Sequence, residues 1–256
     1  MEASYEYFFK FMGQDAKMEI PIFQRAYSWK KEQYEELIND IIKIGKNKDD
    51  DETYFIGSIV FKEKIKNGKI KITIIDGQQR ITTLVILACC LCKLKNIEEE
   101  EKNDLINKFI KTNGKTVKLN LKEKDNGALQ KIINSINSDM DCKFDKDSII
   151  IENAYENINK IVKKEKFENI KNGLNKICFV SIKLNDNDEP QLIFESLNST
   201  GKNLSNSDLI RNYILMNSEK KEDLYKKYWE PIEIEFRKNN INDFDTFIFN
   251  YLIIKR

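Results

Sequence analysis

A strand that turns sharply into an apolar helix is the feature that most constrains this chain. β-Branched residues dominate the segment 70–75, which is typical of a strand, and Asp76-Gly77 follows it. After Gly77, apolar residues recur at helical spacing from Ile81 to Cys92, which predicts one apolar helix face. A glycine at the junction allows a tight turn and leaves the first helical N–H groups at the positive end of the dipole.

Such a helix N-terminus is a ready site for an anion, and phosphate is its usual occupant. Arg80, expected to be exposed in the first turn, can fork onto a phosphate oxygen. Gln78 and Gln79 add neutral groups that can hold a phosphate, a metal-bound water or a base edge. The alternative is an ordinary strand-to-helix corner with solvated polar residues, because one glycine and one arginine make a weak phosphate motif.

Composition excludes several classes of function. The 256 residues contain no histidine, so Ser-His-Asp hydrolysis and histidine–metal nuclease chemistry are excluded. Any catalysis must use carboxylates, Lys or Arg with a hard divalent cation. The five cysteines have no zinc spacing, and we expect them to be buried thiols in a reducing compartment.

Charge and hydropathy predict a soluble, cytoplasmic protein with no membrane partner. Met1–Lys10 does not have the pattern of a signal peptide, and no apolar stretch reaches the about 20 residues of a membrane span. The net charge is +1, from 43 basic and 42 acidic residues, which argues against a general polyanion binder. Lysines between Lys62 and Lys71 form either a local basic patch or a solvated face.

The pattern predicts a helix-rich α+β fold in three parts. Residues 1–95 form the core, 96–175 a helical insertion or lid, and 176–256 a returning strand and C-terminal helices that complete the same domain. The strands expected in one small sheet are Met18–Phe23, Tyr54–Lys62, Lys69–Ile75 and Ile177–Leu184. The expected helices run from an N-cap at Ser28 to Ile44, over Ala154–Val162, from near Glu189, from a capping box at Ser205, and over Glu222–Arg237 and Asp243–Lys255.

A second group of polar side chains flanks the turn before the helix capped by Ser205. Glu195 and Asn198 are three residues apart, and Asp208 and Asn212 are four apart on the next helix. If the turn folds the two helices together, these carboxylates and amides can bind a divalent cation or orient a water. The alternative assigns Asp208 to the capping box and Asn198 to a helix C-cap.

Four motifs follow one another in a recognisable order. They are Ile20-Pro-Ile-Phe-Gln-Arg-Ala-Tyr-Ser-Trp29, Tyr54-Phe-Ile-Gly-Ser58, Ile75-Asp-Gly-Gln-Gln-Arg-Ile-Thr-Thr-Leu84, and Phe194-Glu-Ser-Leu-Asn-Ser-Thr-Gly-Lys-Asn-Leu-Ser205 with Asp208-Leu-Ile-Arg-Asn212. Together they resemble the N-terminal domain of GmrSD-type, modification-dependent restriction endonucleases, which is also found in the SspE and BrxU phage-defence proteins. The resemblance covers about Met18–Tyr213, and Asp-Gly-Gln-Gln-Arg is its most diagnostic element.

The resemblance implies a ParB/sulfiredoxin-like core built on a small mixed sheet. It also implies that the domain binds and hydrolyses a nucleoside triphosphate (NTP), and that hydrolysis is coupled to restriction of modified phage DNA. Family members usually carry a histidine–metal nuclease domain after this one, and this chain has no histidine. We therefore expect either a fragment or a protein that works with a separate nuclease subunit. A homodimer is left open.

The family hypothesis gives the motif residues specific roles. Gly77 and the amides after it would hold the phosphates, with Arg80 as a clamp. One of the two glutamines would orient the attacking water, and one of two carboxylates would bind Mg²⁺. The candidates for catalysis are Asp76, Gln78, Gln79 and Glu195, of which Asp76 and Glu195 are the candidate Mg²⁺ ligands.

Other candidate residues come from the flanking motifs. Gln24 and Arg25 interrupt an apolar run after a predicted strand, and we expect them in the same cleft as Arg80. Further candidates for phosphate binding are Thr82, Thr83, Asn198, Gly201 and Lys202. Asp208 and Asn212 are candidates for a structural or metal-orienting role.

Two alternatives from other classes of function remain. One is a DNA-binding module without catalysis, which uses Gln24, Arg25 and the Lys62–Lys71 patch on the DNA backbone. The other is a metal-dependent, ParB-like nuclease, because acidic residues with Mg²⁺ can cleave DNA without histidine.

Overall fold

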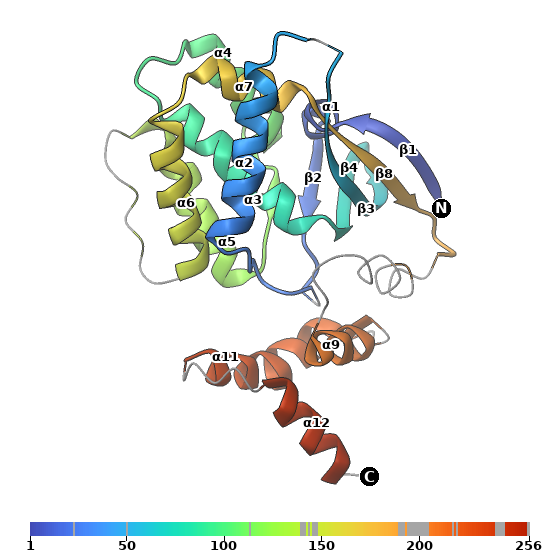
Figure 1. Ribbon diagram of the computed structural model, residues 1–256. Helices are drawn as coiled ribbons and strands as arrows, with labels where there is room; N and C mark the ends of the chain where they lie inside the picture. Colours follow the sequence, from blue (N-terminus) through green and yellow to red (C-terminus); the bar gives the residue numbers. More distant parts are fainter. Residues whose placement is uncertain are drawn as a thin grey trace. The chain divides into compact units, whose positions relative to one another are not determined.

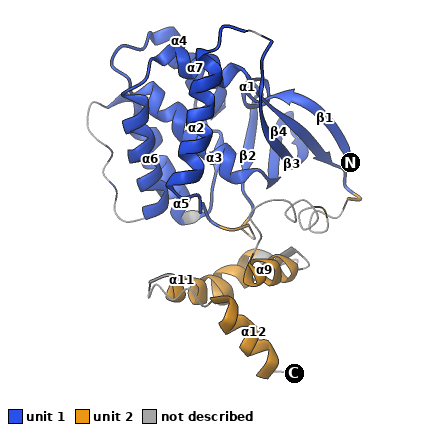
Figure 2. Ribbon diagram, viewed as in Figure 1, with its two compact units in different colours: residues 1–21, 26–186 blue, residues 22–25, 187–256 orange. Residues whose placement is uncertain are grey.

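The computed structural model of the chain contains two compact units, which are described separately (Figures 1 and 2). The first unit contains residues 1–21 and 26–186, and the second contains residues 22–25 and 187–256. The two units do not coincide with the three predicted parts, 1–95, 96–175 and 176–256. The boundaries of those parts stay a prediction. The structure describes residues 1–22, 24–49, 51–112, 114–138, 142, 144, 148–188, 193, 205–216, 218, 220–238 and 244–254.

A six-stranded mixed sheet forms one layer of the first unit (Figure 1). Its strand order is β1-β8-β3-β4-β2-β7. The central pairs are β3 with β4, antiparallel, and β3 with β8, parallel. The predicted helix-rich α+β class and the shared sheet are therefore confirmed. The strand bounds are β1 Glu2–Tyr7, β2 Ala16–Glu19, β3 Tyr54–Lys66, β4 Lys69–Asp76, β7 Leu119–Asn120 and β8 Ile177–Leu184.

Two strand predictions are corrected by the structure. The strand predicted at Met18–Phe23 begins at Ala16 and ends at Glu19, because Pro21 has no N–H to continue the ladder. Its last predicted residue, Phe23, lies outside the described residues. Strand β1 was not predicted at all, since its mostly exposed residues show no apolar face.

The hairpin between β3 and β4 confirms the predicted turn. Asn67 and Gly68 have φ angles of 52° and 70°, and Lys66 pairs with Lys69 across the turn. Two successive residues with positive φ match the right-handed twist of the paired strands. The hairpin therefore fixes the register that brings the end of β4 beside the middle of β3.

Helix α3 (Gln78–Cys92) follows β4 and is buried around its whole circumference. The predicted helix and the burial of its apolar positions from Ile81 to Cys92 are confirmed, and the burial extends beyond one face to every residue except Arg80. The reason is that the sheet covers one side and the segment after residue 96 supplies helices on the others. The elements in contact with α3 are α4 Glu99–Leu105, the π-helical turn η1 Ile106–Ile110, α5 Glu123–Asn134 and α6 Ile149–Val162, and α7 Phe167–Asn175 follows them in the chain.

Helix α2 (Lys31–Lys46) packs on α7 and confirms the predicted buried stripe at Tyr34, Leu37, Ile38, Ile41 and Ile42. Its predicted N-cap, Ser28, is wrong. The N-cap is Lys30, whose N–H donates to the Gln33 side chain at 2.7 Å. The Ser28 N–H instead donates to Gln79 Oε1 on α3, at 2.9 Å. Among the described residues the buried Ser28 hydroxyl has no hydrogen-bond partner, so it caps no helical N–H.

The second unit is helical in its described part. Ser205 Oγ accepts the Asp208 N–H at 3.1 Å, which confirms the predicted cap at the start of α9. Ile22 packs against Leu215 and Tyr225. None of the described helices is long and apolar enough to cross a membrane. The helices are α9 Asn206–Met216, α10 Lys221–Leu224, the π-helical turn η3 Tyr225–Trp229, α11 Glu230–Lys238 and α12 Phe244–Ile254.

A buried lysine ties three segments of the first unit together. Lys118 has no exposed surface. Its burial lowers the pKa from 10.5 to about 8, and the carboxylate of Asp15 opposes the shift. The ammonium is still mainly protonated at pH 7. Its Nζ donates to the carbonyl oxygens of Met12, Gln14, Asn107 and Lys108 at 2.6, 3.0, 3.2 and 2.7 Å.

Lys118 makes stability depend on pH in a defined direction. Between the folded pKa of about 8 and the unfolded value of 10.5, the unfolded chain binds more protons than the folded one. The free energy of unfolding therefore rises with pH in this window, by at most about 1.4 kcal/mol per pH unit. Urea titrations of the wild type and Lys118→Met at pH 7, 8, 9 and 10 should diverge in favour of the wild type. Lys118→Gln is the substitute if Lys118→Met does not fold. If the free energies of unfolding of wild type and variant changed in parallel with pH, the lowered pKa of Lys118 would be rejected.

The glycine at the start of α3 is required for two separable reasons. Gly77 has a φ of 92°, and a Cβ there would lie 2.9 Å from Ile59 Cγ1. Gly68 has a φ of 70° but open space around it. Gly68→Ala is expected to cost about 1 kcal/mol of unfolding free energy through backbone strain alone, and Gly77→Ala roughly 2–3 kcal/mol. Equal losses in chemical denaturation would show that the contact with Ile59 does not matter.

Candidate functional site

The candidate site is built where β4 ends and α3 begins. Asp76 is the last residue of β4, and Gly77 turns the chain in the left-handed conformation, with φ 92° and ψ 4°. The turn starts the helix at Gln78, and the first intrahelical bond joins the Ile81 N–H to the Gly77 carbonyl at 3.1 Å. The N–H groups of Gln78, Gln79 and Arg80 therefore lie in the first turn, where no preceding helical carbonyl can accept them.

Arg80 connects this turn to the start of β3. Its Nη1 donates to the Ile56 carbonyl, and its Nη2 lies 3.3 Å from Asp76 Oδ2. The side chain is 20% exposed, so the expectation of an exposed first-turn arginine is wrong. Burial lowers the pKa of Arg80 and the Asp76 carboxylate opposes that shift. A guanidinium keeps its charge in proteins, so the site holds a fixed cation.

A glycine in β3 makes room for that guanidinium. Gly57 has a φ of 90° and lies at an irregularity in the pairing of β3 with β8, between Phe55 and Ser58. A Cβ on Gly57 would come 2.5 Å from Arg80 Nη1. The motifs 54–58 and 75–84, which are far apart in sequence, thus meet through one side chain. Sequence reasoning missed the role of Gly57, and its position within a family motif was the available signal.

Gln79 fixes a third motif to the same helix. Its Oε1 accepts the Ser28 N–H at 2.9 Å, and its Nε2 donates to the Ala26 carbonyl at 3.2 Å. The hydroxyls of Tyr27 and Thr83 are 2.8 Å apart, and Thr83 also donates to the Gln79 carbonyl at 2.9 Å. Burial raises the pKa of Tyr27 well above its ordinary value, so its phenol stays neutral. Gln79 and Thr83 therefore hold the backbone of residues 26–28.

Gln78 stands apart from its neighbours in this motif. Gln78 is 8% exposed, and among the described residues its amide makes no hydrogen bond, although its polar atoms are not fully shut off from solvent. Thr82, one turn further along, is 2% exposed. Of the two glutamines of the motif, Gln78 is therefore the one that does not hold the protein's own backbone.

The remaining predicted residues lie elsewhere. Gln24 and Arg25 belong to the second unit, so their predicted cleft with Arg80 stays a prediction. Glu195, Asn198, Gly201 and Lys202 lie outside the described residues, and with them the predicted convergence with Asp208 and Asn212. Among the residues that the structure describes, no three Cys, Asp or Glu side chains are grouped as a metal site would require.

Asp208 and its neighbours form an ion-pair network inside the second unit. Arg211 is 1% exposed, and its guanidinium lies 2.7 Å from Asp208 Oδ1 and 3.2 Å from Glu233 Oε1. Glu233 also accepts the Tyr225 hydroxyl at 3.2 Å, and Asn212 is buried on the same helix. This network joins α9 to α11, which favours a structural role for Asp208.

Three of the four motifs, at residues 26–28, 54–58 and 75–84, thus meet at α3, and the chain was compared with known protein families. Residues 8–215 match the family described as GmrSD restriction endonuclease, N-terminal domain. The chain belongs to this family. The resemblance inferred from the motifs is thereby confirmed, whereas the ParB-like detail stays a prediction. Membership supports a role for this GmrSD N-terminal domain in a restriction system. No curated protein sequence matches the chain.

The close approach of the Arg80 guanidinium to Gly57 can be tested with a double-mutant cycle. Gly57→Ala is expected to push the guanidinium off the Ile56 carbonyl and lower the free energy of unfolding by roughly 2–3 kcal/mol. In an Arg80→Ala background the clash is absent, so the same change should cost less. Urea denaturation of the four proteins in this double-mutant cycle should give an interaction energy of about 1 kcal/mol. Additive losses would contradict the contact.

Proposed function

We propose that this domain binds a nucleoside triphosphate at the N-terminus of α3, hydrolyses it with Mg²⁺, and thereby regulates restriction of modified phage DNA. One observation carries the proposal. The turn at Gly77 leaves three helical N–H groups in the first turn of α3, and the same turn carries the charged Arg80 and the Gln78 side chain. Helix dipole, backbone donors and a fixed cation together favour a bound phosphate.

Arg80 is suited to a clamp because it is already held in place. Its guanidinium has five donors, and the bonds to Ile56 and Asp76 use two of them. The side chain is not fully buried, so part of it faces solvent. A donor that is fixed before the ligand arrives loses little freedom on binding, which increases affinity. The bonds from Arg80 to Ile56 and Asp76 therefore support its proposed role as a phosphate clamp.

Asp76 and Gln78 are the described residues that we assign to catalysis. Mg²⁺ usually binds one or two carboxylates together with phosphate oxygens and waters, so a single carboxylate beside the phosphate site fits the ion. Asp76 is 23% exposed and adjoins the turn. Of the two glutamines, Gln79 is engaged with residues 26–28, so we assign the orientation of water to Gln78. Glu195 remains the second candidate ligand for Mg²⁺.

The DNA-binding module without catalysis is the second candidate, and the β3–β4 hairpin gives it limited support. Lys62 pairs with Asp186 at 3.1 Å and Lys71 with Glu19 at 2.7 Å, so two members of the predicted patch are neutralised. Lys64, Lys66 and Lys69 stay exposed near the tip of the hairpin. Three exposed lysines make a small footprint on a DNA backbone. We therefore prefer the nucleotide site.

The nucleotide assignment is tested by removing the Gln78 amide. Gln78→Ala is expected to weaken binding of Mg²⁺–NTP about 5- to 30-fold, the loss of one or two hydrogen bonds. Isothermal titration with each of the four NTPs, with and without Mg²⁺, measures the change. Gln130→Ala on α5 removes the same side chain from another helix and should leave affinity unchanged. Unchanged affinity in a folded Gln78→Ala protein would return the turn to a plain structural corner.

Arg80 needs a milder substitution than alanine, because alanine also removes the bond to Ile56. Arg80→Lys keeps the charge but loses the planar fork, and we expect about 10- to 100-fold weaker NTP binding. Circular dichroism must first show an intact fold. Glu195→Gln should reduce turnover steeply while sparing binding in the absence of Mg²⁺. If NTP binding survives Arg80→Lys in full, the clamp is wrong and the DNA-binding module becomes the better account.

A further inference from the structure

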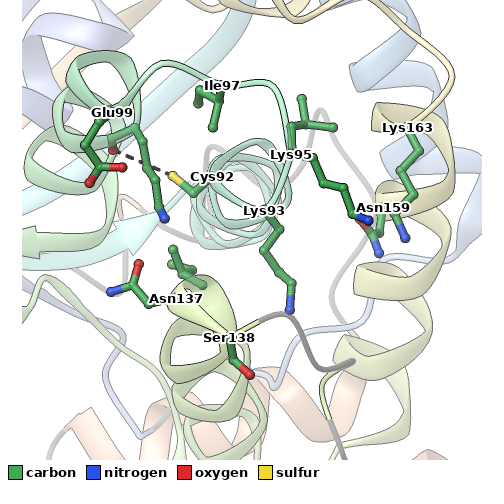
Figure 3. Close-up of a pocket in the computed structure, with 12 residues that line it drawn as sticks. Cys92, Lys93, Lys95, Ile97, Glu99, Asn137, Ser138, Asn159 and Lys163 are labelled. Carbon is green, nitrogen blue, oxygen red and sulfur yellow. Dashed lines mark hydrogen bonds between the residues drawn. The ribbon is translucent and has the colours of Figure 1, made fainter.

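A polar pocket lies at the C-terminal end of α3 (Figure 3). Its volume is about 590 Å³, which falls in the range of small-molecule sites. The C-terminal end of α3, the connection to α4, the short helix η2 (Ser135–Asn137) and the last turn of α6 form its walls. Helix α3 has 15 residues, so the pocket is roughly 22 Å along the helix from Gly77.

The charge of this pocket is strongly one-sided. Four lysines line it, and among the described lining residues Glu99 is the one carboxylate. Lys93 donates from Nζ to the Ser135 carbonyl at 3.0 Å, which fixes its ammonium in the wall. Within the described part of the chain, no carboxylate lies within ion-pair distance of the other three. The four lysines are Lys93, Lys95, Lys102 and Lys163.

The side chains between the lysines suit a ligand that is both polar and partly apolar. In Figure 3, Lys95, Asn159 and Lys163 lie together on one side of the pocket, and Lys93 extends toward Ser138. Asn137 and Asn159 add amide donors, while Ile97 and Ile136 add apolar surface. Burial raises the pKa of the Cys92 thiol to about 12, so this residue adds no negative charge at pH 7.

We propose that this pocket binds a small molecule that carries two or more negative charges on phosphate or carboxylate groups. Several ammonium groups around one concave space repel one another, and a multivalent anion relieves that repulsion while it forms charge-assisted hydrogen bonds. The proposal is independent of the proposed nucleotide function, because it uses different residues at the other end of the helix. Phosphate and carboxylate ligands share this chemistry, and the experiment separates them.

Isothermal titration of the full chain with tripolyphosphate and, separately, with citrate tests the pocket. The variant is Lys95→Gln/Lys163→Gln, which removes two charges from one wall and leaves the core untouched. Its control is Lys17→Gln/Lys69→Gln, which removes two charges from exposed strand positions. We expect at least tenfold weaker binding in the pocket variant and little change in the control. Preference for tripolyphosphate identifies a phosphate ligand, and preference for citrate identifies a carboxylate ligand.

Three outcomes would overturn the proposal. The first is that neither anion binds the wild type at millimolar concentration, and the second is equal loss of binding in the pocket variant and its control. The third compares the pocket variant with Gln78→Ala, which weakens the proposed nucleotide site and leaves the four lysines of the pocket in place. If tripolyphosphate binding were lost in Gln78→Ala and kept in Lys95→Gln/Lys163→Gln, the anion would belong to the start of α3. That result would support the nucleotide site and reject this pocket.

Discussion

The burial of α3 is the constraint on which the first unit depends. An apolar helix with a single non-buried residue, Arg80, cannot lie on a surface, so it needs cover on every side. The sheet supplies one side, and the helices after residue 96 supply the others. A helix enclosed in this way reaches polar surroundings only at its two ends. Both candidate ligand sites lie there, one at Gly77 and the other beyond Cys92.

The family motif at the start of α3 acts first on the protein's own backbone. Gln79 holds residues 26–28, and Arg80 holds Ile56 beside Gly57. The motif therefore combines two kinds of residue, those that assemble the turn and those left to contact a ligand. The proposed function assigns Gln78 and the first helical N–H groups to the second kind. A substitution at Gln79 or Arg80 changes the shape of the site as well as its chemistry, so loss of activity there does not by itself identify a catalytic group.

The sequence pattern correctly predicted those helices, strands and turns that are determined by residues close together in the chain. The strand Ile177–Leu184 and the turn at Asn67-Gly68 were predicted as observed, because β-branched composition and turn residues determine them. The predicted start of α2 was wrong, because Ser28 is held through its N–H by Gln79, 51 residues away, and its hydroxyl does not cap the helix. The buried cation Lys118 was not predicted either, since its four carbonyl partners come from segments that only the fold brings together.

The two ends of α3 carry opposite partial charges of the helix dipole. This limits how strongly a ligand at one end can change the affinity for a ligand at the other. An anion at Gly77 complements the positive end of the dipole, whereas lysines beyond Cys92 complement the negative end. An anion that neutralises those lysines weakens their favourable interaction with the negative end of the dipole. The anion at Gly77 therefore stabilises the helix dipole, and the anion beyond Cys92 reduces its stabilisation. Each dipole term is only about 0.3–1 kcal/mol, at or below the roughly 1–3 kcal/mol of typical allosteric coupling. Strong coupling would require α3 to move, and close packing on all sides opposes such movement. We therefore infer that the two sites bind their ligands nearly independently.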